Sequence, residues 1–596
     1  MELLKDGSIS ISAPQDGIGV SYLDTKKAKN IQCLDISSVP GACLANYEAI
    51  NMMEDYIGTY TASTCTADTN DLITVSVSKN FVLGLAVKFT TTGTLPAPLS
   101  ATTTYYVSYI SGNTIKVATS LANVIAGTHV DITDTGSGTH SIAATGLSAI
   151  RKIVQNPGAT TANFKYFALD SAGKVWAQYG NIWSHLPGNT AGDGEGLDIW
   201  KGYLFAYTAT KVETYGPLTA AGDSAAWTTS WQTLDSDGQF HPSLVASNDR
   251  LYIGAANYIA EVYENSGQTF APGTAGTYTY TQKVLTLPAG YRVKTLAELS
   301  GDLAIGTWKG NDLDTYAMDF KVADIFFWDK SSTLSFRRPV QLYEHGINQM
   351  ITVGNTLYVV AGFDGRIYAT DGVNVSQVGQ IPKGLDNIQQ STTSLWFWPN
   401  AIMHHRGKIY IGVSSSATGT IAPLGVFSFD PKTGNICVEN ILSSNNDGSS
   451  GRVVIGALLS SGAETYYIGI IADASKIYQG GINIVKPANG RYETGAFFET
   501  GLMEVGTLLN KKTYTNVDLL FGKVLTTDQG VKLYYRTAST GSYTLLGTFN
   551  YASLGAVSQS NATIVLEAVS TVQFKVELIP HSTGDSPEFI GLIIHP

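Results

Sequence analysis

Apolar and polar residues alternate with a period of two along most of this 596-residue chain. Alternation of this kind is typical of β-strands, because successive side chains of a strand point to opposite faces of its sheet. The helical pattern, with apolar residues three and four positions apart, is almost absent. The sequence therefore predicts an all-β fold.

One hairpin pattern recurs from about Lys165 onward. A strand rich in Leu, Tyr, Ile and Val ends near a glycine or a short turn, and a second strand follows. The third residues of these first strands are 37 to 57 residues apart, and they are Phe167, Leu204, Tyr252, Ala304, Tyr358, Tyr410 and Tyr467. Repeats of about 40–50 residues with several strands each are typical of propeller blades. The repeat predicts a β-propeller of roughly seven blades, and a β-sandwich with coincidental hairpins is the alternative.

A propeller must close its ring of blades. Strand-like residues 31–47 precede the first copy of the repeat. We expect them to complete the last blade by pairing with the chain near residues 481–486, because this would leave no open sheet edge there.

The repeat divides the chain into four parts. Residues 1–67 form an N-terminal segment that contributes strands to the propeller, which itself spans residues 145–487. Residues 68–144 leave the repeat and consist of short strands between Gly, Pro and Asn turns, so we expect an inserted small β-domain. Residues 488–596 alternate cleanly again and predict a C-terminal β-sandwich of jelly-roll type.

Composition limits the classes of partner. Charged residues make up 14% of the chain, and the formal net charge is −11 at pH 7. A phosphate backbone requires concentrated Lys and Arg, so no sequence-specific nucleic-acid binding is expected. No stretch approaches the ~18 uninterrupted apolar residues of a spanning helix, so no membrane insertion is expected.

The four cysteines are too few for a disulfide framework, and their spacing is not that of metal ligands. They are Cys33, Cys43, Cys65 and Cys437. Cys33 and Cys43 could pair, but buried free thiols are favoured because bridges are rare in chains made in a reducing cytosol.

Three segments carry a resemblance to tail proteins of tailed bacteriophages. Residues 90–142, which begin TTTGTLPAPL and end TDTGSGTHSI, resemble a small β-module that recurs in such proteins. Residues 31–50 are similar to the opening of phage virion proteins whose body is a propeller. Residues 530–549 and 586–594 resemble the C-terminal sandwich of the same kind of protein. The resemblance implies an assembled part of a virion, and it supplies no catalytic residues.

The densest acidic cluster is Asp193, Glu195 and Asp198 in AGDGEGLDIW. A glycosidase needs two carboxylates at ~5–10 Å, so these acids are the candidates for catalysis. Acids interleaved with glycine usually mark a solvated loop, and we expect a loop here and no catalytic residues.

No motif indicates a metal or a cofactor. Adjacent residues of a strand point to opposite faces, so His404 and His405 do not form a metal pair, and we expect one of them to pack beneath the strand KIYIG. Residues 234–240 and 443–451 hold oxygen ligands but lack the full calcium loop with its terminal Glu.

The best candidate for a contact surface is the aromatic run in SLWFWPNAI, which contains Trp396, Phe397 and Trp398. On a strand, Trp396 and Trp398 would share one face, which could stack on sugar rings or on a partner subunit. Packing between blades is the favoured alternative, as it is for Trp227 and Trp231.

We therefore expect a structural protein without enzymatic activity, located in the tail of a tailed-phage virion and made in the host cytoplasm. Identical copies would assemble as a nozzle or hub ring, with six-fold symmetry as the first guess. The ring would form or flank the DNA exit channel and contact other tail proteins. The alternatives are a receptor-binding protein that recognises host surface glycan and a propeller glycan hydrolase.

Overall fold

A computed structural model describes most of the chain. Residues outside the description are 19–26, 29, 37–40, 48, 57–62, 77–80, 82, 145–147, 161–163, 181, 191, 193, 219–225, 236–239, 310–321, 332–338, 383–394, 416–424, 442–452, 473–477, 487–491, 494, 508, 539–540 and 582–584. The described chain is almost entirely β, with two short helices. Neither helix among these residues has the length and apolar character needed to cross a membrane.

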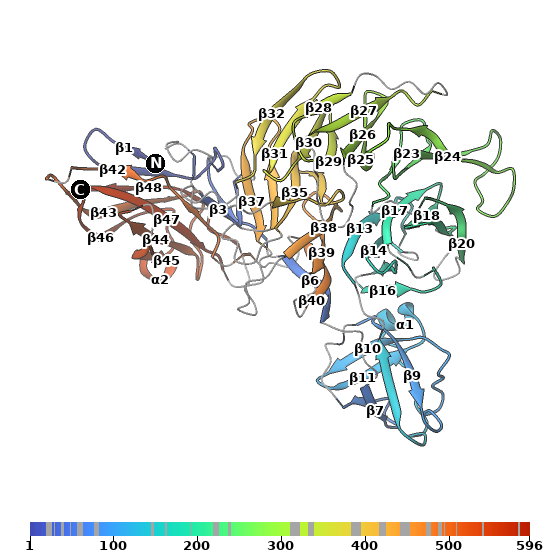
Figure 1. The fold of residues 1–596 in the computed structure, drawn as a ribbon. Coiled ribbons are helices and arrows are strands. Elements are labelled where there is room, and N and C mark those ends of the chain that lie inside the picture. Colours follow the sequence, from blue (N-terminus) through green and yellow to red (C-terminus); the bar gives the residue numbers. More distant parts are fainter. Residues whose placement is uncertain are drawn as a thin grey trace.

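Seven consecutive antiparallel sheets, here called blades one to seven, make up the body of the described chain (Figure 1). Blade one is β13 (Ile150–Gln155), β14 (Tyr166–Asp170), β15 (Val175–Tyr179) and β16 (Ile182–Leu186), and blade two is β17 (Gly194–Trp200), β18 (Tyr203–Thr208), β19 (Lys211–Gly216) and β20 (Ala226–Thr233). Blade three is β21 (Ser243–Val245), β22 (Leu251–Ala255), β23 (Tyr258–Glu264) and β24 (Tyr278–Thr286), and blade four is β25 (Tyr291–Leu299), β26 (Asp302–Lys309), β27 (Ala323–Trp328) and β28 (Val340–Leu342). Blade five is β29 (Ile347–Val353), β30 (Thr356–Ala361), β31 (Arg366–Thr370) and β32 (Val375–Gln380). Blade six is β34 (Ile402–His405), β35 (Lys408–Ser415), β36 (Gly425–Phe429) and β37 (Ile436–Ile441), with β33 (Leu395–Trp396) also on β35. Blade seven is β38 (Val453–Ser460), β39 (Tyr466–Ala472), β40 (Tyr478–Val485) and β6 (Ala49–Tyr56).

The blades form a closed ring. The first strand of each blade contacts the first strand of the next, and β38 of blade seven contacts β13 of blade one. The all-β, propeller-based fold predicted from the sequence is therefore confirmed. The seven repeat anchors lie on the second strands of the seven blades, from Phe167 on β14 to Tyr467 on β39.

The glycine of the repeat has a packing role. A Cβ on Gly254 would lie 2.6 Å from the Val293 side chain of the following blade. A Cβ on Gly469 would lie 2.6 Å from the Ile150 side chain, where blade seven meets blade one. Since real Cβ atoms do not approach so closely, glycine lets neighbouring blades pack together at these points.

An N-terminal strand completes the last blade, but it is not the predicted one. Strand β6 pairs with β40, with Met53 opposite Ile482 and Ala49 opposite Val485. The expectation for residues 31–47 is wrong: β3 (Asn30–Gln32) pairs with a strand of the C-terminal sandwich, and β4 (Leu34–Asp35) pairs with β5 (Leu44–Ala45). The apolar side chains of this segment are buried against the sandwich, which is the physical reason for its position.

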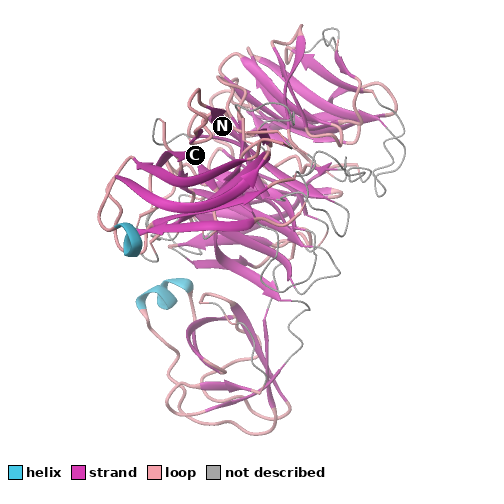
Figure 2. Ribbon diagram, turned by 90° about the vertical axis from the view of Figure 1, so that its left-hand side faces the viewer, coloured by secondary structure: helices cyan, strands magenta, loops and turns pink. Residues whose placement is uncertain are grey.

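The insertion between β6 and β13 is a closed barrel (Figure 1). Its strands are β7 (Ser63–Ala67), β8 (Ile73–Val75), β9 (Ala86–Thr91), β10 (Tyr105–Ser111), β11 (Thr114–Ala118) and β12 (His140–Ala144). Helix α1 (Leu121–Ala126) follows β11 and is capped by the Ser120 hydroxyl, which accepts the Asn123 N–H at 3.2 Å. The helix lies on the side of the barrel that faces the ring (Figure 2).

The C-terminal sandwich is made of two sheets and includes N-terminal strands. One sheet has the order β1 (Glu2–Leu3), β2 (Ile9–Ser12), β48 (Phe589–His595), β43 (Lys512–Phe521) and β46 (Gln559–Val569). The other has the order β3, β41 (Phe497–Glu499), β47 (Thr571–Ile579), β44 (Gly530–Arg536) and β45 (Thr544–Asn550), with β42 (Met503–Glu504) on β47. Helix α2 (Tyr551–Leu554) follows β45. The N-terminal segment thus belongs to both units: β1, β2 and β3 to the sandwich, and β6 to the ring.

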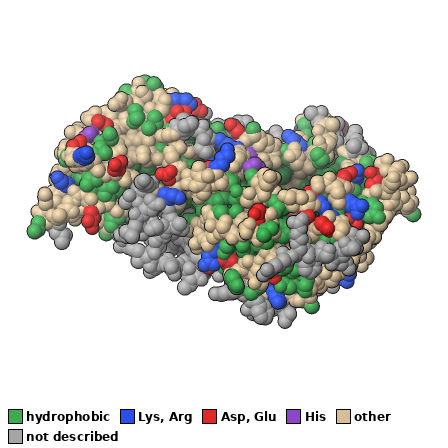
Figure 3. Space-filling model, turned by 90° about the horizontal axis from the view of Figure 1, so that it is seen from above, with side chains coloured by type: hydrophobic (Ala, Val, Ile, Leu, Met, Phe, Trp, Pro, Cys, Tyr) green, Lys and Arg blue, Asp and Glu red, His purple; other side chains and the backbone are tan. Residues whose placement is uncertain are grey.

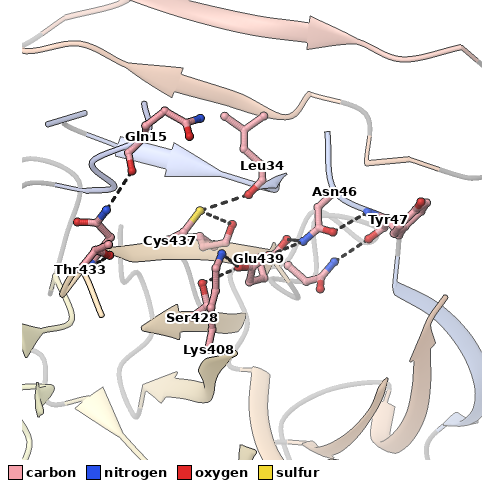
Figure 4. Close-up of polar contacts among 12 residues, drawn as sticks. Gln15, Leu34, Asn46, Tyr47, Lys408, Ser428, Thr433, Cys437 and Glu439 are labelled. Carbon is pink, nitrogen blue, oxygen red and sulfur yellow. Dashed lines mark hydrogen bonds and ion pairs between the residues drawn. The ribbon is translucent and has the colours of Figure 1, made fainter. Parts of the chain in front are cut away.

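A buried polar cluster joins the N-terminal segment to blade six (Figure 4). The Asn46 side-chain amide donates to the Glu439 carboxylate at 2.8 Å and to the Glu439 carbonyl at 3.0 Å. The Ser428 hydroxyl donates to the same carboxylate at 2.5 Å, and the Lys408 ammonium lies 3.4 Å from it. Glu439 is 2% exposed, so this cluster is internal to the molecule.

The four cysteines are buried free thiols, as expected. The Cys437 thiol donates to the Leu34 carbonyl at 3.3 Å, so it adds to the contact between blade six and the N-terminal segment. Burial raises the pKa of the Cys65 thiol to about 11, which disfavours the reactive thiolate.

Candidate functional site in the axial cavity of the propeller

The first strands of the blades enclose a cavity of about 610 Å³, here called the axial cavity. All seven blades contribute to its wall. Its lining includes Lys152 and Val154 on β13, Asp198 and Ile199 on β17, Ser243 on β21, Thr295 and Leu296 on β25, Met350 on β29, Asn400 and Ile402 beside and on β34, and Leu458 and Leu459 on β38. Its size is within the ~300–1,000 Å³ typical of small-molecule sites.

One cation and one anion line this cavity among the described residues. Burial lowers the pKa of the Lys152 ammonium, and the nearby Asp198 carboxylate partly opposes that shift. The Asp198 carboxylate accepts the Ile199 N–H at 2.8 Å. The cavity therefore offers one pair of opposite charges within a wall of mixed polar and apolar character.

The structure describes two of the three acids of the predicted cluster, Glu195 and Asp198. The expectation of a solvated loop is wrong, because Glu195 and Asp198 both lie on β17, the innermost strand of blade two. Asp193 is outside the described residues. Gly196 stands on this strand because a Cβ there would overlap the His241 carbonyl of blade three. The glycines that suggested a loop are thus packing positions.

Glu195 and His241 form a close buried contact. The Glu195 carboxylate lies 3.1 Å from the His241 ring nitrogen Nε2, and the two side chains are 5% and 0% exposed. The other ring nitrogen, Nδ1, lies 3.1 Å from the Gly254 carbonyl oxygen. Because Glu195 belongs to blade two and His241 enters blade three, the pair joins neighbouring blades.

A second buried lysine, Lys294, lies in the first half of β25. The Lys294 ammonium donates to the Asn348 side chain of blade five at 2.7 Å, and its nitrogen lies 5.8 Å from the centre of the Phe240 ring. Burial lowers the pKa of Lys294 to about 7. Sequence reasoning missed Lys152, His241 and Lys294. Their one shared signal is a polar residue in or just before the first half of a blade's first strand.

The aromatic run does not form the expected shared face. Strand β33 ends at Trp396, Phe397 is buried, and Trp398 lies beyond the strand. The Trp398 ring packs edge-on against Phe240 at 5.4 Å, and the Arg151 guanidinium lies 6.0 Å from its centre. The Trp398 carbonyl accepts the Gln349 side-chain amide at 2.7 Å.

Trp398 therefore contacts residues from blades one, three and five, which lie around the ring. The indole itself packs on Phe240 and Arg151, from blades three and one, so it reaches across the interior of the propeller. The arrangement corresponds to packing between blades, and the sugar-stacking interpretation loses the shared face on which it rested.

The remaining aromatic and histidine candidates also pack internally. Trp231 lies 5.5 Å from Phe205 and 5.8 Å from Phe270, centre to centre. His405 is 3% exposed, its Nδ1 lies 2.9 Å from the Ser460 hydroxyl, and burial lowers its pKa to about 4. The expectation that one histidine packs under the strand is confirmed.

The described residues contain no group of three or more His, Cys, Asp or Glu side chains placed to hold a metal ion. Of the two oxygen-rich segments, residues 443–451 lie outside the description, as do residues 236–239 of the other.

No protein-family model matches this chain, and no curated protein matches it. Similar solved structures include an exo-β-1,3-galactanase from Phanerochaete chrysosporium, with 10% identity, a TM-score of 0.26 and coverage of 60% of this chain and 95% of that chain. The WD40 domain of Neurospora crassa Pan2 has 9% identity, a TM-score of 0.33 and coverage of 57% and 90%. The extracellular domain of a hybrid two component system from B. thetaiotaomicron has 10% identity, a TM-score of 0.35 and coverage of 98% and 76%. Similarity at this level carries no inference about activity.

Proposed function

We propose that this protein is a structural component of the tail of a tailed-phage virion, with a mechanical and not an enzymatic role. Identical copies assemble as a ring, with six-fold symmetry as the first guess, at a nozzle or hub position. The ring forms or flanks the DNA exit channel and contacts other tail proteins. The sequence resemblance of residues 90–142 to a phage tail module supports this proposal, and the apolar contacts that join the ring to the sandwich and to the barrel are the structural observation that carries it.

The ring and the sandwich share one apolar core. Phe427 of blade six, Ile31 of the N-terminal segment and Phe498 of the sandwich belong to the same buried cluster. Together with the Glu439 cluster, this core makes the contact between the two units both apolar and specific. Large apolar interfaces of this kind oppose relative motion of domains.

The barrel is also held against the ring. The Ile182 side chain of blade one fills the space that a Cβ on Gly84 would occupy. Leu121 of helix α1 shares an apolar cluster with Phe164 and Leu186 of blade one. A body built in this way transmits force between its ends, as a tail spacer must.

The interior of the propeller is a poor path for DNA. Trp398 crosses the middle of the ring, and the axial cavity has a volume of about 610 Å³. In the proposed assembly the exit channel therefore lies between copies and not through each propeller. On the face seen in Figure 3, the described Lys and Arg side chains are scattered among acidic and uncharged groups, which is compatible with DNA passing without binding.

Mass photometry of the purified 63.5 kDa chain, with electron microscopy of any oligomer, tests this proposal. We expect a closed ring whose central opening lies between propellers, and we expect the chain in purified particles of a phage that encodes it. A chain that stays monomeric at every concentration and is absent from those particles would overturn the proposal. Release of new reducing ends from host envelope polysaccharide would overturn its non-enzymatic part.

A further inference from the structure

An amine, a carboxylate and a carboxamide meet where the N-terminal segment contacts blade six (Figure 4). Lys408 is the first residue of β35, Glu439 lies on β37, and Asn46 directly follows β5. Lys408 is 7% exposed, Asn46 is 5% exposed and Glu439 is 2% exposed. The three functional groups are therefore enclosed together, away from bulk water.

The Glu439 carboxylate contacts both of the other groups. The Lys408 nitrogen Nζ lies 3.4 Å from its oxygen Oε1, and the Asn46 nitrogen Nδ2 donates to its oxygen Oε2 at 2.8 Å. The Ser428 hydroxyl also donates to Oε1, at 2.5 Å, and so holds the carboxylate in place. A carboxylate placed between an amine and an amide in this way can carry protons from one to the other.

The carbonyl group of the Asn46 side chain is polarised from its other side. The backbone N–H of Tyr47 donates to the Asn46 oxygen Oδ1 at 2.9 Å. A fixed donor at this oxygen stabilises the negative charge that develops when a nucleophile adds to the neighbouring carbon Cγ. The cluster thus contains a nucleophile, an acid–base group and an activated acyl carbon, which are the parts needed for acyl transfer.

Enclosure favours the reactive form of the amine. Transfer of a proton from the Lys408 ammonium to the Glu439 carboxylate removes two buried charges and leaves an amine with an available electron pair. The flexible four-carbon stem of lysine lets this amine swing from the carboxylate toward Asn46. The fold also keeps the amine and the amide close together, so the reaction is effectively unimolecular.

We propose that Lys408 and Asn46 become joined by an intramolecular amide bond, with Glu439 as the acid and base. After giving a proton to Glu439, the Lys408 nitrogen attacks Asn46 Cγ and forms the new C–N bond. Glu439 passes that proton to Asn46 Nδ2 and takes one from the Lys408 nitrogen. The Cγ–Nδ2 bond then breaks with its electron pair on nitrogen, ammonia leaves, and it carries the last proton away as ammonium.

This bond would tie the N-terminal segment to blade six beside the apolar core that the ring shares with the sandwich. A covalent link between residues so far apart in the sequence restricts the unfolded chain and therefore stabilises the fold. The inference does not rest on the proposed tail role.

The mass of the intact, denatured full-length chain tests the proposal. We expect it to be lower than the mass of the sequence by about 17 Da, which is one molecule of ammonia. A tryptic digest should contain a branched peptide that joins the segment carrying Asn46 to Lys408. Trypsin should not cleave after Lys408, because the side chain in the amide bond carries no charge. The branched peptide distinguishes the link from loss of ammonia by an asparagine alone.

Two variants should abolish the loss of ammonia. Lys408→Arg keeps a positive charge beside Glu439 but removes the nucleophilic amine, and Glu439→Gln keeps a side chain of the same size that cannot carry the protons. Each variant should have the full mass of its own sequence. Lys294→Arg is the matched control, because it changes another buried lysine, and it should lose ammonia as the parent chain does.

The proposal is overturned if the parent chain has its full sequence mass both directly after purification and after prolonged incubation. It is also overturned if the loss of ammonia persists in Lys408→Arg or if the branched peptide is absent. The mass of the parent chain decides the matter even if a variant fails to fold. Neither result would bear on ring assembly, so this proposal and the tail role fail separately.

Discussion

Glu439 is the buried carboxylate on which blade six and the N-terminal segment converge. Glu439→Ala would leave the Lys408 ammonium, itself mostly buried, without this carboxylate, and would remove the carboxylate acceptor that Asn46 and Ser428 share, leaving Asn46 only the backbone carbonyl of residue 439. We expect a loss of about 3 kcal/mol in the free energy of unfolding, measured in urea. Glu504→Ala is the control, since Glu504 is exposed, and it should change stability by less than about 0.5 kcal/mol. Equal stability of the two variants would contradict the role of this cluster.

Lys294 makes the stability of the ring depend on pH, and its lowered pKa fixes the direction of that dependence. Its pKa is lowered to about 7 in the fold, whereas an unfolded lysine titrates near 10.4, so between these values only the unfolded chain keeps the proton. Stability should therefore rise with pH across this window, because the unfolded state binds more protons there.

Lys294→Met removes the free-energy cost of burying an amino group that the unfolded chain would keep protonated. After allowance for the donor that Asn348 loses, we expect about 2 kcal/mol more stability at pH 7, with the gain shrinking as the pH approaches 10. Melting temperatures at several pH values measure the effect. Lys432→Met, at an exposed position, should show no such trend, and a pH-independent effect of Lys294→Met would contradict the argument.

At the residue scale the sequence predicted the burial of some side chains and not of others. Free buried cysteines and a packed histidine followed from residue type alone. The position of Glu195 and Asp198 on an inner strand did not follow from the sequence. A glycine next to an acid is equally compatible with a loop and with a tightly packed inner strand.

At the element scale, the glycine that recurs in the second strand of several blades is visible in the sequence, and the structure explains it by close packing between blades. In Gly469→Ala the new methyl group would press on the Ile150 side chain, at 2.6 Å, where blade seven closes on blade one. We expect a loss of about 1–3 kcal/mol, as is typical of overpacking. In Gly462→Ala the methyl group would meet only Thr465, at 4.0 Å, so that variant should unfold at nearly the parental urea concentration. A parental midpoint for Gly469→Ala would show that the ring does not close as described.

The strands of the blades were predictable because their local pattern repeats. The pairing of the N-terminal strands was not predictable, because tertiary contacts alone determine it. All seven hairpin anchors lie on equivalent strands, because each blade must bury the same alternating faces. Residues 31–47 and residues 49–56 both alternate like strands, and nothing local says which one reaches β40. The sandwich offers the first of these segments an apolar cluster for Ile31 and Leu34, and that burial decides the outcome.

At the scale of the whole molecule, the N-terminal segment is part of two units at once. Deletion of residues 1–46 would remove strands from both sheets of the sandwich and would take Asn46 from Glu439. We expect the sandwich of the truncated chain to be digested by trypsin under conditions in which the intact chain resists, because open edges and exposed core raise local unfolding. Resistance equal to that of the intact chain would contradict this dual role.

The barrel should respond to deletion in the opposite way. Its six strands close on themselves and borrow none from the ring. Its contacts with the ring are made by side chains, around α1 and Ile182 and in an apolar cluster that the barrel shares with Trp183 of blade one. Replacing residues 63–144 by a short Gly-Ser linker should therefore leave the ring folded, because loop length changes closure entropy only slowly. We expect a cooperative urea transition for the remaining chain and a near-ultraviolet circular dichroism spectrum that keeps the ring's aromatic signal. A ring that unfolds without its barrel would show that the two units fold as one.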